Sequence, residues 1–168
     1  MQCKVIAASI RSIQPVNSIL CIPSARSLIF ASRNGWASGG VMQLSLKDNL
    51  PFIPITVAYK EKRVDIPNVL IDTGSATTIL DADFASQIQI VPSPEDILYT
   101  IRGIGGSEVV FTRQIDFLKI GQYYINDFVV EIGNMSYGFG INGILGMDFL
   151  IKAGAIIDLQ KSRIDFLQ

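Results

Sequence analysis

One acidic turn, set between two apolar runs, constrains this chain more than any other feature. The turn is residues 72–76 (Asp-Thr-Gly-Ser-Ala), entered from residues 69–71 (Val-Leu-Ile) and left through residues 77–80 (Thr-Thr-Ile-Leu). A carboxylate at the end of a buried strand is costly unless hydrogen bonds or a partner stabilise it. Gly74 lets the turn bring backbone N–H groups close to Asp72, and the neighbouring threonine supplies a hydroxyl. The stretch therefore predicts a buried strand followed by a tight turn that holds a carboxylate.

The composition leaves carboxylates as the main chemical groups. The chain has no histidine, which excludes Ser-His-Asp and Cys-His catalysis and the common histidine-containing zinc sites. Both cysteines, Cys3 and Cys21, lie in the first 21 residues, and free thiols are expected there rather than a disulfide. The rest of the chain has no thiol nucleophile, so we expect neither a metal nor another cofactor.

Length and charge set further bounds. A chain of 168 residues, 49% hydrophobic and 17% charged, is long enough to bury a core as one domain with at most an appendage. The net charge is −1 and no basic run exceeds residues 60–63, so no nucleic-acid partner is indicated. No apolar run approaches the roughly 18 residues of a membrane span.

The chain changes character near Met42. Residues 1–41 contain no Asp or Glu but four basic residues and seven serines. This composition is typical of an organellar transit peptide; alternatively, Met42 is the true start and the upstream segment is translated leader or mis-called sequence. Either way we expect a poorly ordered leader over 1–41 and a folded domain over 42–168. The expected location is the cytoplasm, or an organelle if the leader directs import.

From residue 42 onward the pattern is all-β with turn punctuation. We expect a charged turn over 61–65, an extended segment over 76–80 and a loop over 91–94, where two prolines occur. Short helices are expected over 81–87, with Asp81 as the N-cap residue, and over 147–152. The expected strands are 52–59, 97–101, 109–120, 123–132, 155–159 and 163–167.

A second motif, residues 143–150 (Gly-Ile-Leu-Gly-Met-Asp-Phe-Leu), follows the acidic turn at a fitting distance. Together the two motifs resemble those of the retropepsin-like aspartic proteases, over roughly residues 43–168. The resemblance implies a closed, all-β, retropepsin-like barrel with one or two short helices. It also implies an aspartic endopeptidase that hydrolyses peptide bonds in extended polypeptides through a water activated by two aspartates.

The chain contains one Asp-Thr-Gly and no second copy, since Asp158 and Asp165 are followed by Leu159 and Phe166. A single motif supplies one of the two carboxylates. By resemblance the other comes from a second copy of the chain, so the expected partners are the chain itself, as a homodimer with Asp72 from each protomer, and a polypeptide substrate.

The resemblance assigns supporting roles around Asp72. Thr73 would hydrogen-bond across the two-fold axis, the Gly74 backbone would lie against the carboxylates and the peptide, and Ser75 would bond near the outer carboxylate oxygen. Alternatively, Thr73 and Ser75 only satisfy the local turn. Three residues of the second motif would pack behind the turn, the glycine leaving room for the two loops to cross: Ile144, Leu145 and Gly146.

The glycine-rich tip between the strands at 97–101 and 109–120 would be the flap that closes over the peptide. Its residues are Gly103, Ile104, Gly105 and Gly106. The alternative is an ordinary tight turn.

Two positions depart from the viral pattern. Viral members usually have an acidic residue and an arginine that form an ion pair where this chain has Ala76 and Met147. The ending at residues 146–150 is instead similar to that of LTR-retrotransposon and stand-alone bacterial members. We interpret Asp148 as a helix cap rather than a chemical group.

Another class of function is a protease-like fold used as a catalytically silent dimerisation or peptide-binding module. The intact motif at Asp72 argues against it, because binding alone does not require a charge there. An aspartyl-phosphate enzyme is excluded because the required lysine-containing or metal-binding segments do not follow Asp72.

Overall fold

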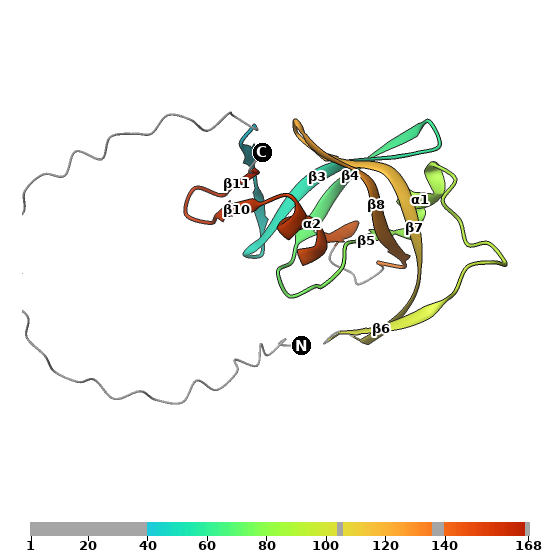
Figure 1. Ribbon diagram of the computed structural model, residues 1–168. Helices are drawn as coiled ribbons and strands as arrows, with labels where there is room; N and C mark the ends of the chain where they lie inside the picture. The colour runs from blue at the N-terminus through green and yellow to red at the C-terminus, as the bar shows by residue number, and fades with distance from the viewer. Residues whose placement is uncertain (1–39, 104–105, 136–139, 167–168) are drawn as a thin grey trace, which may run out of the picture. The chain divides into compact units, whose positions relative to one another are not determined.

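The computed structural model describes residues 40–103, 106–135 and 140–166. The expectations for the leader, apart from its last two residues, and for flap residues Ile104 and Gly105 lie outside these ranges. In the described part the fold is all-β with two short helices, as expected (Figure 1). Its elements are β1 (Met42–Gln43), β2 (Ser45–Lys47), β3 (Leu50–Tyr59), β4 (Lys62–Ile71), β5 (Ile79–Asp81), α1 (Ala82–Gln87), β6 (Tyr99–Gly103), β7 (Gly106–Ile120), β8 (Tyr123–Gly133), β9 (Gly143–Leu145), α2 (Met147–Lys152), β10 (Ala155–Asp158) and β11 (Arg163–Phe166).

Six strands form a ring. The larger sheet has the order β2-β3-β4-β9-β5-β8-β7-β6, and a further pairing of β3 with β7 joins the two sides. That pairing sets Thr56 opposite Lys119 and Ala58 opposite Phe117. Two of the pairings, β4 with β9 and β5 with β8, are parallel, while the others within the ring are antiparallel. The barrel expected from the resemblance is therefore present as a ring of strands.

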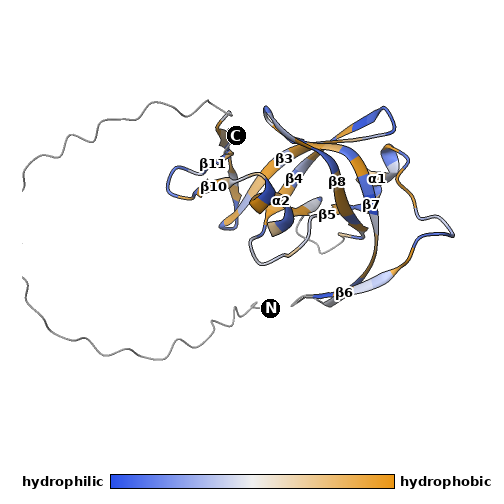
Figure 2. Cartoon of the chain, viewed as in Figure 1, coloured by the Kyte–Doolittle hydropathy of each residue, from blue (hydrophilic) through white to orange (hydrophobic). Residues whose placement is uncertain are grey.

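The core lies inside this ring, together with one face of α2. Figure 2 shows hydrophobic colour along β3, β4 and β8 and hydrophilic colour at the hairpin end that joins β3 to β4. Phe149 of α2 is fully buried and makes edge-to-face contacts with Phe128 of β8 and Phe166 of β11. Burying such a side chain contributes about 2–3 kcal/mol, so α2 is held mainly by this anchor rather than by its own six residues.

The expected charged turn over 61–65 is wrong. The turn is only Lys60 and Glu61, both with positive φ (47° and 67°), and β4 begins at Lys62. Val64 is buried while Arg63 is exposed, so the charges alternate with core residues along a strand. Two-residue turns with positive φ at both positions match the twist of a hairpin, which is why the strands can meet so closely.

Both expected helices are confirmed. Asp81 is the N-cap residue of α1, and its carboxylate accepts from the backbone N–H of Asp83 at 3.0 Å. The second helix runs over Met147–Lys152 as expected. The C-terminal hairpin is confirmed as β10 and β11, with β1 added on the other side of β11 to give a small sheet of order β1-β11-β10.

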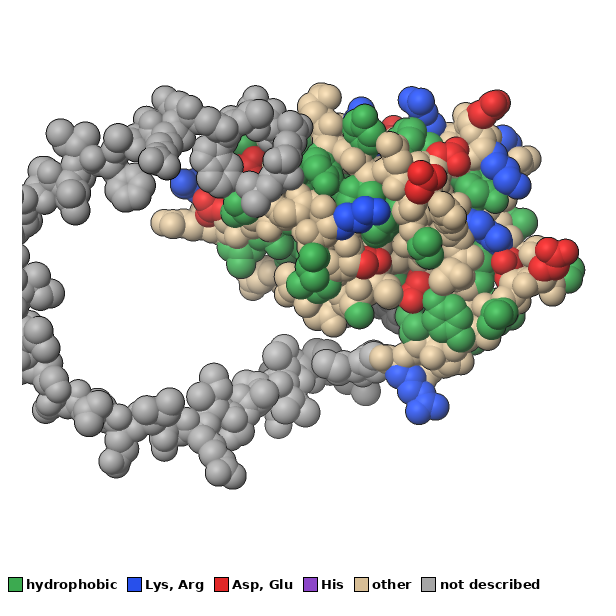
Figure 3. Space-filling model, viewed as in Figure 1, with side chains coloured by type: hydrophobic (Ala, Val, Ile, Leu, Met, Phe, Trp, Pro, Cys, Tyr) green, Lys and Arg blue, Asp and Glu red, His purple; other side chains and the backbone are tan. Residues whose placement is uncertain are grey.

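The surface carries mixed charges. On the face shown in Figure 3, lysine and arginine side chains are interspersed with acidic and hydrophobic ones. Across the described residues, no helix is both long enough and apolar enough to cross a membrane.

Candidate active site

Asp72 lies immediately after β4, where the chain turns away from the neighbouring strand β9. Its backbone N–H donates to the carbonyl of Leu145 at 3.1 Å, and its own carbonyl accepts from the N–H of Ser75 at 3.2 Å. The carboxylate accepts from the N–H of Gly74 at 2.8 Å. Asp72 is half-buried while Thr73 and Gly74 are exposed, so the turn presents the carboxylate at the surface of this chain.

Two residues of the second motif, Ile144 and Leu145, lie on β9 directly beside the strand that leads into the turn. Ile144 is paired with Leu70 and Leu145 with Ile71, in parallel register. Leu145 is fully buried. The hydroxyl of Ser75 donates to the carbonyl of Thr77 at 2.8 Å, a contact within the turn of the kind the alternative interpretation expected.

Residues 76–78 do not continue as an extended strand, because β5 begins only at Ile79. The loop instead supplies acceptors to the start of α2. The N–H groups of Met147 and Asp148 donate to the carbonyls of Ser75 and Ala76, at 2.9 and 3.2 Å. The first N–H groups of a helix have no partner within the helix, so this loop satisfies two of them and fixes α2 against the acidic turn.

Gly146 is required by a close approach. A Cβ atom at this position would lie 2.3 Å from the carbonyl oxygen of Thr77 and 2.4 Å from its carbon, and side chains do not tolerate such contacts. The sequence interpretation gave Gly146 the role of making room for loops to cross. In this chain the space is taken by the backbone of the acidic loop itself.

Asp148 is not the N-cap residue of α2, which is Gly146 and has no side chain to accept a hydrogen bond. The Asp148 carboxylate does accept from an N–H of the first helical turn, that of Phe149 at 2.7 Å. It also reaches back to Thr78, accepting from its hydroxyl at 2.7 Å and from its N–H at 2.9 Å. The Thr78 hydroxyl in turn accepts from the N–H of Gly146 at 3.1 Å. One fully buried threonine thus links the acidic loop to α2.

We expect Thr78→Val to lower the free energy of unfolding by about 2–3 kcal/mol. Valine keeps the shape of threonine but leaves the buried N–H of Gly146 without its acceptor and removes one of the two donors to Asp148 Oδ1. Chemical denaturation of the two forms measures the difference. Thr112→Val, at an exposed position on β7, is the matched control and should change stability by less than about 0.5 kcal/mol. Equal effects of the two changes would contradict the role given to Thr78.

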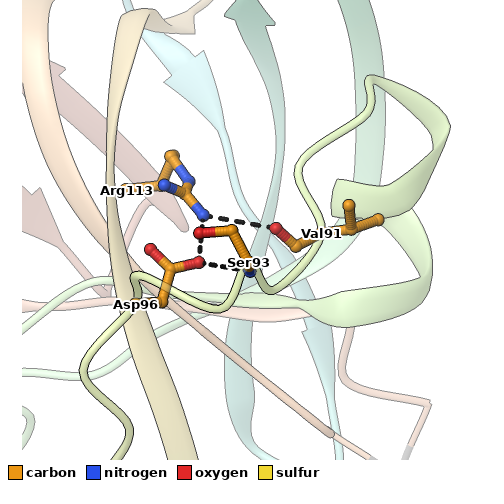
Figure 4. Close-up of polar contacts among 4 residues, drawn as sticks. All are labelled: Val91, Ser93, Asp96 and Arg113. Atoms are coloured by element: carbon orange, nitrogen blue, oxygen red, sulfur yellow. Dashed lines mark hydrogen bonds and ion pairs between the residues drawn. The ribbon is translucent and has the colours of Figure 1, made fainter.

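The hairpin to which the resemblance gave the role of a flap is formed by β6 and β7. Gly103 lies opposite Gly106 at its tip, and the pairing continues to Tyr99 opposite Val110. The loop before β6 is tied to β7 by Arg113, whose guanidinium contacts Asp96 at 2.6 Å and the carbonyl of Val91 at 3.2 Å (Figure 4). The Arg113 guanidinium and the N–H of Ser93 lower the pKa of Asp96, which favours the charged form that holds this loop.

Sequence reasoning missed one polar pair near the flap. The hydroxyl of Tyr99 on β6 donates to Glu131 on β8 at 2.9 Å, and Glu131 is 8% exposed. The signal was a single acid within the apolar run Val129-Val130-Glu131-Ile132. In the described residues there is no group of three or more His, Cys, Asp or Glu side chains that could hold a metal ion.

Comparison with known proteins decides the family. A family model described as aspartyl protease matches residues 54–149, which span the acidic turn, the flap hairpin and the start of α2. The chain belongs to the aspartyl protease family. This protease also resembles a solved structure, a retropepsin-like aspartic protease from Rickettsia conorii, with a TM-score of 0.54 and 17% sequence identity. The match covers 74% of this chain and 97% of that one, and it supports the retropepsin-like fold. A search of curated proteins found no match.

These findings establish the protease as an aspartic endopeptidase with a retropepsin-like fold, as the sequence motifs implied. Asp72 lies within the matched region.

Proposed function

We propose that this protease cleaves extended polypeptides as a homodimer, with one Asp72 from each protomer forming the active site. The observation that carries the proposal is that the chain has a single Asp-Thr-Gly, placed on a turn whose Thr73 and Gly74 are exposed. Aspartic proteolysis requires two carboxylates that share a proton, since like charges about 3 Å apart cannot both ionise. A second copy of the turn is the simplest source of the second carboxylate.

In the proposed dimer the ionised Asp72 takes a proton from a water, which attacks the carbonyl carbon of the scissile peptide bond. The protonated Asp72 of the other protomer donates a hydrogen bond to the carbonyl oxygen as that atom gains charge. Collapse of the tetrahedral intermediate with proton transfer to the leaving nitrogen yields a carboxylic acid and an amine. The two carboxyl groups titrate as a coupled pair, so neither Asp72 has a pKa of its own. Either protomer can therefore supply the ionised carboxylate before substrate binds.

A surface beside the turn is suited to contact with a second copy. An apolar groove of about 340 Å³ is lined by Thr73 and Met147, together with residues of α2 and β10. Two of its lining side chains are unusually exposed for isoleucine, Ile151 at 71% and Ile156 at 43%. Covering these side chains would contribute about 25 cal/mol for each Å² of apolar surface removed from water. Because the groove is continuous with Thr73, a partner seated on it would also approach Asp72.

A subunit-mixing assay tests the shared site. Wild-type protease is held at constant concentration with saturating unfolded protein substrate, and a fivefold excess of the Asp72→Asn form is added and allowed to exchange. If both protomers contribute to one site, only about one wild-type chain in six pairs with another, and activity falls about sixfold.

The control is the double variant Asp72→Asn, Ile156→Lys, in which a charge lies in the groove. It should neither exchange into dimers nor inhibit. Activity that is unaffected by the Asp72→Asn form after exchange would show that each chain works alone. Absence of cleavage by the wild-type dimer would favour the silent binding module instead.

A further inference from the structure

A row of side chains runs across the sheet from the base of the catalytic turn. Leu70 of β4 is paired with Ile144 of β9, which is paired with Ile79 of β5, and Ile79 is paired with Glu131 of β8. Directly paired residues place their side chains on the same face of a sheet, and residues two apart on a strand share that face. Asp72 follows Leu70 by two positions. The row therefore lies on the face toward which the catalytic turn opens.

Glu131 is the charged member of this row, and it is buried. Its neighbours on β8, Val130 and Ile132, are each 1% exposed and belong to the core on the opposite face. Glu131 is 8% exposed although it points away from that core, so other parts of the chain cover it. One of them is Tyr99, whose hydroxyl donates to Oε1.

The second carboxylate oxygen of Glu131 is not used. Within the described residues, Oε2 is buried and has no hydrogen-bond partner. Leaving a buried acceptor without a partner is expensive, and such atoms in native proteins call for a ligand or a functional explanation. Burial and the hydrogen bond to Glu131 raise the pKa of Tyr99 to about 12, so Tyr99 keeps its proton and remains the donor at Oε1. Tyr99 therefore leaves Oε2 without a donor.

One element in contact with Glu131 is β6, an arm of the hairpin that the proposal treats as the flap. Tyr99 is the first residue of β6, and the loop that precedes it is held to β7 by Asp96 and Arg113. A peptide between the flap and the catalytic turn would pass along the row that contains Glu131. A second acid, Glu108 of β7, accepts from the N–H of Asn134 at 3.3 Å, close to the end of β8, and adds negative charge nearby.

We infer that Glu131 determines substrate specificity by accepting a hydrogen bond at Oε2 from a lysine or arginine side chain of the bound peptide. The inference rests on the proposed function, because it uses the same peptide channel. Glu131 is three strands away from β4, about 14 Å at the usual strand spacing. An extended peptide advances about 3.3 Å per residue, and a lysine side chain spans part of that separation. The basic residue therefore occupies the second to fourth position from the scissile bond.

The test uses paired peptides built on a sequence that the wild-type protease cleaves. Each pair differs only by lysine or norleucine at one position, from the second to the fourth residue on either side of the scissile bond. Lysine and norleucine share an aliphatic stem, so the comparison isolates the charge. We expect the wild type to prefer lysine by about tenfold or more in kcat/KM at one of these positions, as a charge-assisted hydrogen bond would give.

Three variants test whether Glu131 is the source of the preference for lysine. Glu131→Gln should lose most of the preference for lysine over norleucine. Tyr99→Phe keeps the carboxylate and should keep the preference, whereas Asp127→Asn, at an exposed position on the same strand, should leave both peptides unaffected.

The outcomes separate the inference from the proposed function. Cleavage that depends on Asp72 but shows no preference for lysine in the wild type would overturn the inference alone, and this measurement does not depend on the folding of any variant. Equal loss of preference in Glu131→Gln and Tyr99→Phe would also overturn it, since the effect would then come from the flap arm. Absence of any cleavage by the wild type would overturn both.

Discussion

Replacing Asp72 with asparagine should lower kcat by about 10⁴-fold while leaving the fold intact. Asparagine matches aspartate in shape, and its side-chain oxygen can still accept from the N–H of Gly74, now at 2.8 Å. It can neither take a proton from water nor donate the shared proton to the scissile carbonyl, and general acid–base steps contribute about 10²–10⁴-fold each. The homodimer of the variant lacks both functions. Cleavage of an unfolded protein from about pH 4 to 7 measures the loss.

The control for this change is Asp148→Asn, a second carboxylate near the same turn that the structure assigns to holding Thr78. It should reduce stability and leave measurable cleavage at a temperature where the variant is folded. Cleavage by Asp72→Asn at the wild-type rate would remove Asp72 from the chemistry. The wild type and Asp72→Asn must have the same melting temperature, so that a difference in cleavage cannot come from a difference in folding.

The second large effect is expected at Gly146. Alanine there would place Cβ 2.3 Å from the carbonyl oxygen of Thr77, so either the acidic loop or α2 must move. Movement of either disturbs the hydrogen bond from Met147 to Ser75 and the contacts of Thr78 with Asp148. We expect a loss of about 4 kcal/mol in the free energy of unfolding, which is a large part of the 5–15 kcal/mol typical of a domain. The melting temperature should fall by about 15 °C.

Gly40→Ala provides the comparison. Its added Cβ would lie 3.6 Å from the side chain of Gln122, an ordinary contact, and its melting temperature should stay close to that of the wild type. Equal melting temperatures for Gly146→Ala and Gly40→Ala would contradict this prediction, because the acidic loop would then be able to move without loss of stability.

Much of the fold was predictable because local signals agreed with the tertiary structure. The helix over Met147–Lys152 and the hairpin of β10 and β11 have the expected positions. The turn before β4 was misjudged because charged residues were taken as a loop signal, whereas Val64 and Ile66 between them carry the alternation of a strand. The charged composition of this segment indicated a loop and its alternating pattern indicated a strand, and the strand is what the structure shows.

The parts of the site that depend on residue identity could be predicted from the sequence. The parts that depend on contacts between residues far apart in the sequence could not. The motif at Asp72 and its partner segment at residues 144–146 were found from sequence, and β9 does lie beside β4. The extended interpretation of 76–78 failed because those residues serve α2, which follows 70 residues later along the chain. The hydrogen bonds of Asp148 with Thr78 were missed for the same reason, since its position in a first helical turn indicated only a contact within the helix, which it makes with the N–H of Phe149. The position of Glu131 relative to Asp72 could not be predicted, because it depends on the register of four strands, β4, β9, β5 and β8.

The parallel pairing of β4 with β9 also sets the order of events during synthesis. A nascent chain that has emerged as far as Met135 already contains Asp72 but not the strand and helix that hold its turn, because β9 and α2 begin at Gly143 and Met147. Contacts so distant in sequence form late in folding. The turn at Asp72 is therefore held in place only after residues 143–152 have left the ribosome, and a shorter nascent chain lacks the contacts that position its carboxylate.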